Sequence, residues 1–362
     1  MNHGPALSVS ERAIHVVALP MQYQQRFGDF LAKAFPDSVL VYADEKDEQA
    51  MRALLHRADV AILSRDASPA VLNSKSLRWI HCNHAGIDQF APAELFDASR
   101  TITTAAGRSA SAIAEHALFF MLALTGQQYR FWLAQRWRCW GIARRGQMQA
   151  LHGKTVLIVG AGHTAQALAK LCAAHGMNIV GYRRRVAEPV SGIPTMYASD
   201  AGDKLKALVG SVDFLLLCAS LNDSSHRLVD QTVIDAMQPD SFIVNVARAG
   251  LLDASALRAA LGEGRLAGAA LDVFDAEPLS VFSPMWRCRN LLLTPHTSPP
   301  LPDRDWRAMQ AIKENAARYR AGLPLRNQMT LRDAYTEPAR RRNRIELMLT
   351  RLWSRCVRWA LR

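Results

Sequence analysis

Short apolar runs alternate with segments of helical spacing along most of the chain. The N-terminal third contains five such runs, at residues 13–19, 38–43, 60–64, 77–83 and 101–105. Stretches with helical spacing, including FGDFLAKAF and DEQAMRALLHR, separate most of them. Buried strands that alternate with helices are typical of a parallel sheet covered on both faces. The first part of the chain is therefore predicted to be a doubly wound α/β domain.

A second alternating series begins after Lys154. Six strands with helices between them make a complete dinucleotide-binding sheet, so a Rossmann domain is predicted here. The strand candidates lie at 155–160, 178–183, 212–218, 241–247, 267–274 and 291–296. A helix expected at 303–321 follows the last strand and should return to the first domain. The predicted organisation is a discontinuous substrate domain at 1–106 and 300–335, a Rossmann domain at 107–299, and a tail at 336–362.

A long apolar helix is expected from Ile113 onwards, in the sequence IAEHALFFMLAL at 113–124. Its LFFMLAL segment is apolar on nearly all sides, so another surface must bury it. A domain core and a subunit interface both satisfy this requirement, and the pattern leaves the two interpretations open.

Length and composition exclude several classes of protein. A chain of 362 residues with 49% hydrophobic and 21% charged residues is typical of a globular protein with two domains. No apolar run approaches the roughly 20 residues that span a bilayer, and the N-terminus lacks the pattern of a secretory signal. Six cysteines without a CxxC pair argue against a zinc ribbon or a disulfide framework. We therefore expect a cytoplasmic protein and assign no metal site.

The net charge of +12 is concentrated in the tail. Residues 340–362 contain eight arginines and one glutamate, a net charge of +7. The rest of the chain carries only +5, so the high isoelectric point does not predict binding to nucleic acid.

Residues 344–362 are predicted to form a basic amphipathic helix. Arginines 344, 351, 355, 358 and 362 fall on the side opposite the apolar positions. The arginines exclude a membrane-spanning role. A helix of this kind can lie on an anionic membrane, bind an acidic partner or pack against its own dimer, and all three interpretations stay open. The apolar positions are Ile345, Met348, Leu349, Leu352, Cys356 and Trp359.

The sequence VLIVGAGHTAQALAKLC contains a dinucleotide-binding fingerprint of the form GxGxxA. Gly160 would permit the tight turn, and Gly162 would let a pyrophosphate approach the backbone at the start of a helix. The third position needs only a small residue where the helix packs on the strand, and Ala165 meets this need. The motif ends an apolar strand and opens a helix, as the fingerprint requires. We also assign to the cofactor site His163, Thr164, Ala219 and Val246.

The end of the next strand reads NIVGYRRR, where an acidic residue would bind a ribose 2′-hydroxyl. Arg183 occupies that place and is followed by Arg184 and Arg185. Guanidinium groups bind a 2′-phosphate, whereas a carboxylate repels it. We therefore predict NADP(H) as the preferred cofactor with NAD(H) as a possible substitute; the alternative is an ordinary solvated basic turn.

Three further side chains indicate a catalytic site: Arg248 in VNVARAGLLD, Glu277 in LDVFDAEP and His296 in LLLTPHTS. An arginine can hold a carboxylate through two parallel N–H bonds. A histidine can pass a proton to a carbonyl, and a neighbouring glutamate can keep the imidazole charged and oriented. Together with a nicotinamide site, these residues predict the conversion of a 2-keto acid into a 2-hydroxy acid.

From about residue 77 to 335 the chain resembles the D-isomer-specific 2-hydroxyacid dehydrogenases. The family's phrases occur in the expected order: HCNHAGIDQF, SAIAEHALFFMLAL, LHGKTVLIVGAGHTA, MQPDSFIVNVARAGLLD, LAGAALDVFDAEPL and NLLLTPHTS. The resemblance implies an α/β fold with two doubly wound parallel-sheet domains, a Rossmann domain and a flavodoxin-like substrate domain, with a cleft between them. The tail at 336–362 lies outside the region that resembles this family.

The resemblance also implies residue roles. It assigns proton transfer to His296 supported by Glu277, and binding of the substrate's carboxylate and carbonyl to Arg248. It places Asp272 against the nicotinamide carboxamide, and it implies a homodimer through the helix at 113–124. The loop whose backbone amides would hold the substrate carboxylate consists of Ala85, Gly86 and Ile87.

Three positions depart from the family pattern. Ala249 follows the arginine where glycine is common, Ser220 replaces a usual proline, and TSPP follows His296. None of these departures removes a catalytic group. We therefore expect an NADPH-dependent reductase of the glyoxylate or hydroxypyruvate type that forms the D-2-hydroxy acid. The alternative is a cofactor-sensing interaction protein similar to the corepressors that share this fold.

Overall fold

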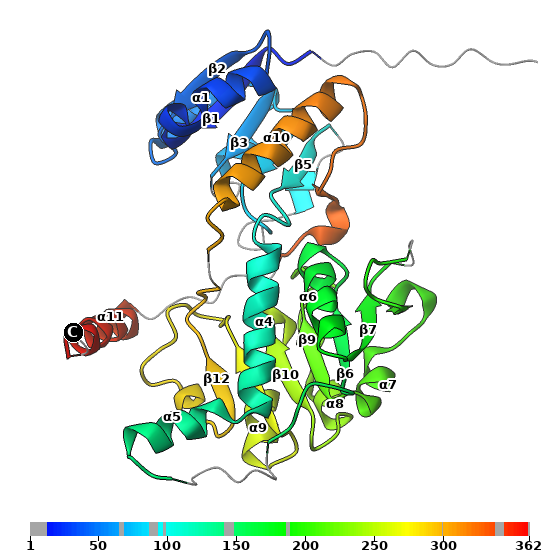
Figure 1. The fold of residues 1–362 in the computed structure, drawn as a ribbon. Helices are drawn as coiled ribbons and strands as arrows, with labels where there is room; N and C mark the ends of the chain where they lie inside the picture. Colours follow the sequence, from blue (N-terminus) through cyan, green and yellow to red (C-terminus); the bar gives the residue numbers. More distant parts are fainter. Residues whose placement is uncertain are drawn as a thin grey trace, which may run out of the picture. The chain divides into compact units, whose positions relative to one another are not determined.

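The computed structural model describes residues 13–64, 69–86, 93–96, 99–140, 148–185, 189–298, 300–336 and 344–360. The chain forms two compact units, one of residues 1–108 and 301–337 and the other of residues 109–300 and 338–362. Each unit contains a parallel sheet with helices on both faces (Figure 1). The predicted α/β class with two doubly wound sheets is thus confirmed.

The first unit has a six-stranded sheet in the order β13-β5-β4-β3-β1-β2. Apart from the antiparallel pair of β13 and β5, its strands are parallel, and β2-β1-β3-β4-β5 is the flavodoxin-like order. Its strands are β1 (Val16–Pro20), β2 (Val39–Ala43), β3 (Val60–Leu63), β4 (Trp79–Cys82), β5 (Thr101–Thr104) and β13 (Gln328–Met329). Its helices are α1 (Gln22–Ala34), α2 (Glu48–Leu55), α3 (Pro69–Leu72), α10 (Arg304–Arg320) and the short η1 (Ala93–Phe96) and η7 (Leu331–Asp333).

Helices α1 and α10 lie together on one face of this sheet, although more than 250 residues separate them in sequence (Figure 1). Alternate strand residues, such as Val17 and Ile62, pack against them, whereas Ala18 and Leu63 point to the other face near α2. This period of two is what a sheet buried on both faces requires. The segment predicted at 303–321 is therefore a core helix of the first unit.

The second unit has a seven-stranded parallel sheet in the order β12-β11-β10-β9-β6-β7-β8. Numbered from the first strand, this is the Rossmann order with one strand added at the far edge. The strands are β6 (Thr155–Val159), β7 (Asn178–Arg183), β8 (Thr195–Ala198), β9 (Phe214–Leu217), β10 (Phe242–Asn245), β11 (Gly268–Leu271) and β12 (Leu291–Leu293). The helices are α4 (Ala110–Thr125), α5 (Gln128–Arg136), α6 (His163–Ala174), α7 (Leu205–Leu208), α8 (Gln231–Asp235), α9 (Ala254–Gly262), α11 (Arg344–Ala360) and the short η3 (Ser199–Ala201), η4 (Val209–Ser211), η5 (Ala249–Leu251) and η6 (Pro284–Arg287).

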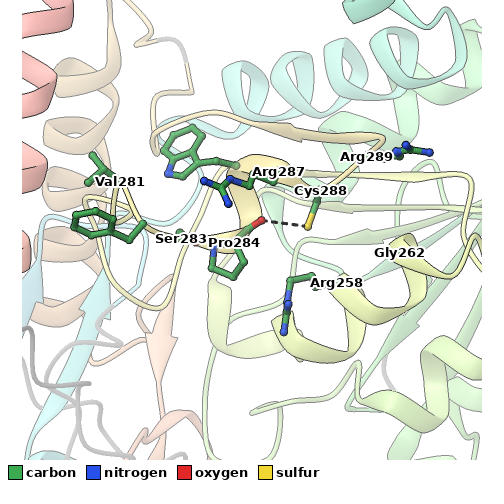
Figure 2. A pocket seen from close by; sticks show the side chains of 10 residues that line it. Arg258, Gly262, Val281, Ser283, Pro284, Arg287, Cys288 and Arg289 are labelled. Carbon is green, nitrogen blue, oxygen red and sulfur yellow. Dashed lines mark hydrogen bonds between the residues drawn. The ribbon is translucent and has the colours of Figure 1, made fainter.

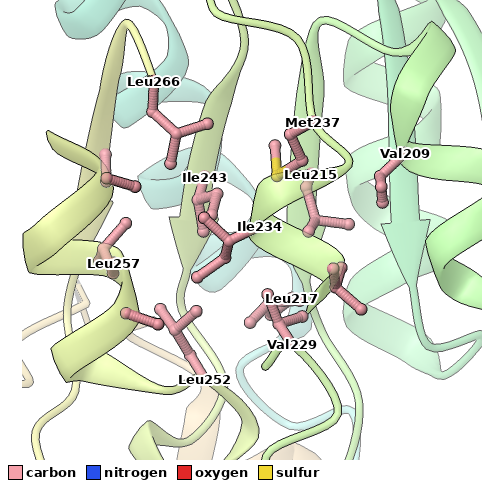
Figure 3. Packing of buried hydrophobic residues seen from close by; sticks show 14 of the residues in the cluster. Val209, Leu215, Leu217, Val229, Ile234, Met237, Ile243, Leu252, Leu257 and Leu266 are labelled. Atoms are coloured by element: carbon pink, nitrogen blue, oxygen red, sulfur yellow. The ribbon is translucent and has the colours of Figure 1, made fainter. Parts of the chain in front are cut away.

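Two hydrophobic clusters cover the two faces of the second sheet. Val156 and Ile158 of β6 belong to the cluster under α4 and α6, which lie side by side (Figure 1). Leu157 and Val159 belong to the opposite cluster. There the residues of β9 and β10 face apolar side chains of α8 and α9 (Figure 3). The alternation holds the strands in one register, which fixes where their carboxyl ends lie.

The apolar helix α4 is only partly buried within the chain. Phe120 and Met121 belong to the core, but Phe119 and Leu122 are 52% and 46% exposed. The sequence left open whether α4 belongs to a domain core or to a subunit interface. The structure shows that one side of α4 packs in the core of the second unit. Among the described residues, no helix has the length and apolar character needed to cross a membrane.

Removal of one core side chain tests the packing of the second sheet. Leu215→Ala, at a fully buried position of β9, is expected to lower the free energy of unfolding by about 2–5 kcal/mol, because it leaves a cavity. Urea unfolding followed by circular dichroism measures the change. The control Leu331→Ala removes the same atoms at a position that is 59% exposed and should change stability by less than about 0.5 kcal/mol. Equal losses in both variants would contradict the assigned core.

Candidate active site

Three neighbouring parallel strands carry the predicted catalytic residues at their carboxyl ends. Arg248 follows β10 and precedes η5, Glu277 lies in the loop after β11, and His296 follows β12. Because β10, β11 and β12 are adjacent and parallel, these ends meet at one edge of the sheet. This topology brings together three residues that are 29 and 19 positions apart in sequence.

A direct hydrogen bond joins His296 and Glu277. The imidazole Nδ1 lies 2.8 Å from Oε2 of the carboxylate, and Oε1 accepts the backbone N–H of Phe274 at 3.0 Å. The carboxylate is thus held on both oxygens, so it fixes the direction of the imidazole ring. With Nδ1 occupied as a donor, Nε2 is the nitrogen that remains for a proton transfer.

The pair also alters the acidity of both groups. The hydrogen bond to Glu277 raises the pKa of His296 above its usual value, although partial burial and the positive charge of Arg248 oppose this. Burial raises the pKa of Glu277, but the hydrogen bonds from His296 and from the Phe274 N–H outweigh it and leave this pKa below its usual value. The pair therefore favours an imidazolium beside a carboxylate, which is the charged state of a general acid.

Asn245 shapes the turn that carries Arg248. Its side-chain Nδ2 donates to the carbonyl of Arg248 at 2.9 Å, and its Oδ1 accepts the N–H of Ala247 at 3.0 Å. The guanidinium Nη1 of Arg248 donates to the carbonyl of Ala247 at 2.8 Å. The positive charge of Arg248 acts to lower the pKa of His296, against the larger effect of the hydrogen bond to Glu277.

The backbone at His296 is in the left-handed region, with φ of +52°. Such a conformation is costly for a residue with a Cβ, and it is found mainly where the surroundings impose it. Here Asp272 imposes part of it. This carboxylate is 2% exposed and accepts the Thr294 hydroxyl at 2.6 Å and the Thr297 N–H at 3.0 Å. Asp272 therefore fastens the chain on both sides of His296.

Two residues that help to hold this turn, His116 and Thr294, were not identified from the sequence. The Nε2 of His116 in α4 lies 3.0 Å from the Thr294 hydroxyl and 3.6 Å from Asp272. Burial raises the pKa of Asp272, but the His116 contact and the other hydrogen bonds outweigh it and leave this pKa below its usual value. The only sequence signals were a histidine inside an apolar helix and a threonine two positions before His296. The predicted contact between Asp272 and a nicotinamide stays a prediction.

The glycines of the fingerprint satisfy the requirements of a dinucleotide site. Gly160 has φ of +110°, and a Cβ there would lie 2.8 Å from the backbone of Cys218 and Ala219. Gly162 precedes α6, and a Cβ there would meet nothing within 4 Å, so the space in front of the helix is open. Ala165 is fully buried, as the small third residue should be. The motif stands between β6 and β9, where the strand order of the sheet reverses and where such sheets bind ligands.

The remaining predicted cofactor residues surround the same edge. His163 and Thr164 begin α6, and Val246 follows β10 and is buried. Arg183 ends β7, and Arg184 follows it with Nη1 3.3 Å from the Ser224 hydroxyl. These positions fit a dinucleotide that extends from the fingerprint to the end of β7.

The predicted carboxylate-binding loop belongs to the first unit. Ala85 and Gly86 come shortly after β4, at the carboxyl edge of that sheet, and Ile87 lies outside the described residues. In the second unit, the segment directly after α5 contains two tryptophans, Trp137 and Trp140. Both are exposed in the single chain.

Comparison with known families bears on this site. The model of the family described as "D-isomer specific 2-hydroxyacid dehydrogenase, NAD binding domain" matches residues 118–298. D-3-phosphoglycerate dehydrogenase of Methanocaldococcus jannaschii is 37% identical over 150 residues. That alignment covers 40% of this chain and 27% of the relative, so the chain matches about a quarter of that protein's length.

Solved structures show the same fold over most of the chain. A D-isomer specific 2-hydroxyacid dehydrogenase family protein from Aeromonas salmonicida is 26% identical and has a TM-score of 0.69. The match covers 89% of this chain and all of that one. The NADPH-dependent glyoxylate/hydroxypyruvate reductase of Sinorhizobium meliloti is 23% identical, also with a TM-score of 0.69. It covers 88% of this chain and 99% of that one, and it shows the shared fold.

Substitution of the carboxylate tests the electrostatics of the pair. Glu277→Gln is expected to lower the pKa of His296, because the imidazolium loses its charged acceptor. The folded-state pKa of His296 is raised, so the pair adds stability below the unfolded pKa and loses this contribution as the pH rises through the folded one. NMR titration of the His296 ring measures the pKa, with the signal assigned from its absence in His296→Gln. The matched control Glu263→Gln should leave that pKa unchanged, and a Glu277→Gln titration identical to the wild type would refute the coupling.

Proposed function

Because the chain belongs to the D-isomer specific 2-hydroxyacid dehydrogenase family, we propose that it reduces a small 2-keto acid to the D-2-hydroxy acid with NADPH. Membership makes it an NAD(P)-dependent oxidoreductase that acts on small 2-hydroxy or 2-keto acids. The observation that supports the proposed chemistry best is the hydrogen bond between His296 and Glu277 beside the charge of Arg248.

His296 supplies the proton in this proposal. When bound, the reduced nicotinamide supplies a hydride to the carbonyl carbon of the keto acid. The imidazolium of His296 gives a proton from Nε2 to the carbonyl oxygen, while Glu277 holds Nδ1 and stabilises the charged ring. Arg248 is a fixed positive charge for the substrate carboxylate and for the negative charge that develops on the carbonyl oxygen.

The substrate carboxylate is assigned a second set of donors in the first unit. We propose that backbone amides of Ala85, Gly86 and Ile87 bind it, since such loops at the carboxyl ends of parallel strands bind anions in doubly wound folds. Backbone donors suit a carboxylate that every substrate shares. These amides would not contact the side chain of the keto acid. They are therefore compatible with an enzyme that accepts several small 2-keto acids.

The preference for NADPH rests on the end of β7. Arg183 and Arg184 stand where a ribose-binding acid would be, and their Nε atoms are buried, so both side chains are held near the sheet. We propose that they bind a 2′-phosphate. The reductase of Sinorhizobium meliloti, described as NADPH-dependent and solved with NADP, makes glyoxylate and hydroxypyruvate the first substrates to test.

We further propose a homodimer in the cytoplasm. The exposed Phe119 and Leu122 on α4 supply an apolar contact surface for a second copy. All six cysteines lie in the described part of the chain and form no disulfide, which suits a reducing compartment.

His296→Gln tests the assigned proton donor. Reduction of glyoxylate and hydroxypyruvate, followed by the absorbance of NADPH, is expected to fall by about 10²–10⁴-fold, the usual contribution of a general acid. The affinity for NADPH, measured by its fluorescence, should be unchanged because the fingerprint is intact. The control His56→Gln changes an exposed histidine and should retain full activity. Loss of cofactor binding in His296→Gln would mean that the residue is structural. Cofactor-induced association of the wild type without turnover would favour the corepressor-like alternative.

Replacing the two arginines tests the cofactor preference. Arg183→Ala combined with Arg184→Ala should raise the KM for NADPH by about tenfold to a hundredfold, since two charge-assisted contacts to a phosphate are lost. The KM for NADH should change less than threefold or so, because NADH lacks that phosphate. Arg185→Ala, at the exposed next position, is the matched control. Equal effects on both cofactors would indicate a solvated basic turn.

A further inference from the structure

Helix α11 contacts its own chain through the side that carries Thr350. The Thr350 hydroxyl accepts the backbone N–H of Val281 at 3.4 Å, and Thr350 is only 3% exposed. Ser354, one turn further along and on the same side, is half-buried and donates to the carbonyl of Thr350 at 2.8 Å. Glu346 lines a hollow together with Ser280 and residues near it. The side that amphipathic helices normally bury, the apolar one, is therefore not the side that packs.

The apolar side of α11 faces away from this contact. At about 100° per residue, the positions of Met348, Leu352, Leu349 and Trp353 cover an arc of about 140°, whose centre is about 130° from Thr350. Their exposed fractions are 55%, 48%, 40% and 63%. Exposure of this surface to water costs a free energy of roughly 25 cal/mol per Å² of apolar area. An exposed apolar patch of this kind is typical of a surface that binds a partner.

Arginines border the apolar arc. Arg351 and Arg355 are one turn apart, both are exposed, and they fall between the apolar side and the packed side. Glu346 is the only acidic residue from 340 to the end of the chain, against eight arginines. The partner must therefore combine an apolar interior with a negatively charged surface.

Further positive charge lies on other segments of the second unit, in α9, at the end of η6 and just after it. A hollow of about 760 Å³ is lined by Arg258, Arg287 and Arg289, and none of its ten lining residues is acidic (Figure 2). It shares Arg258 and Phe282 with the hollow that Glu346 lines, so the two adjoin. Phe282 and Trp286 are 71% and 55% exposed there. The surroundings of α11 thus add to its positive field.

We propose that helix α11 lies on the surface of an anionic lipid bilayer and attaches the protein to it. The apolar arc would enter the headgroup boundary, and Arg351 and Arg355 would contact lipid phosphates. A second copy of the helix is a poorer partner, because symmetric pairing brings two strongly basic helices together. The arc is also broader than the narrow seam of a coiled coil. The helix is about 26 Å long at about 1.5 Å per residue, which suits a helix lying in the plane of the interface.

Sedimentation of the full chain with vesicles tests the proposal. The wild type should bind vesicles of three parts phosphatidylcholine to one part phosphatidylglycerol, and should bind pure phosphatidylcholine at least about tenfold less tightly. High salt should release it. Leu349→Glu with Leu352→Glu should lower the partition coefficient about tenfold or more, and so should Arg351→Glu with Arg355→Glu.

A matched control distinguishes an effect specific to α11 from an effect of the protein's net charge. Arg52→Glu with Arg57→Glu makes the same charge change on exposed positions in or next to α2 and should bind vesicles like the wild type. All variants should keep the wild-type rate of keto acid reduction in solution. Absence of vesicle binding by the wild type, or an equal loss in the α2 control, would overturn the proposal. So would a drop in oligomeric state for Leu349→Glu with Leu352→Glu in light scattering without vesicles, which would assign the arc to a second copy.

Discussion

The hydrogen bond between His296 and Glu277 is the interaction on which the site depends. It fixes the ring nitrogen that faces the carboxylate, and it raises the pKa of the imidazole against the opposing effects of burial and of Arg248. A guanidinium close to an imidazolium would otherwise favour the neutral ring. In the proposed mechanism, the glutamate therefore lets one site contain both a carboxylate-binding cation and a proton donor.

That bond requires a rigid frame, which the sheet supplies. Leu271 of β11 and Leu293 of β12 are register partners, so the residues that follow them, Asp272 and Thr294, come within hydrogen-bonding distance. The buried carboxylate then holds the left-handed turn at His296 from both sides. His116 extends this frame into α4, so the helix that carries the exposed apolar surface also supports the turn at His296.

Much of this arrangement could be predicted from the sequence, because both sheets are built from continuous apolar runs bounded by motifs. Two strands were missed. β8 has four residues, lies at a sheet edge and is largely half-exposed, and β13 has two residues, so neither produces an apolar run. The link from His116 to Asp272 was also missed, since it joins residues more than 150 positions apart. Periodicity gave the apolar side of α11, but only the structure shows that this side points away from the core.

We propose two different roles for arginine in this chain, and burial distinguishes the two sets of arginines. Arg183 and Arg184 are half-buried at the end of β7, where a single phosphate of the cofactor is their proposed ligand. Arg351 and Arg355 are exposed on a helix and act as a diffuse field that a surface of many charges can satisfy. At about 0.1 M salt, interactions between exposed charges more than about 10 Å apart are largely screened, whereas contacts of buried groups are screened much less. Added salt should therefore weaken attachment through α11 well before it weakens the hold on the cofactor.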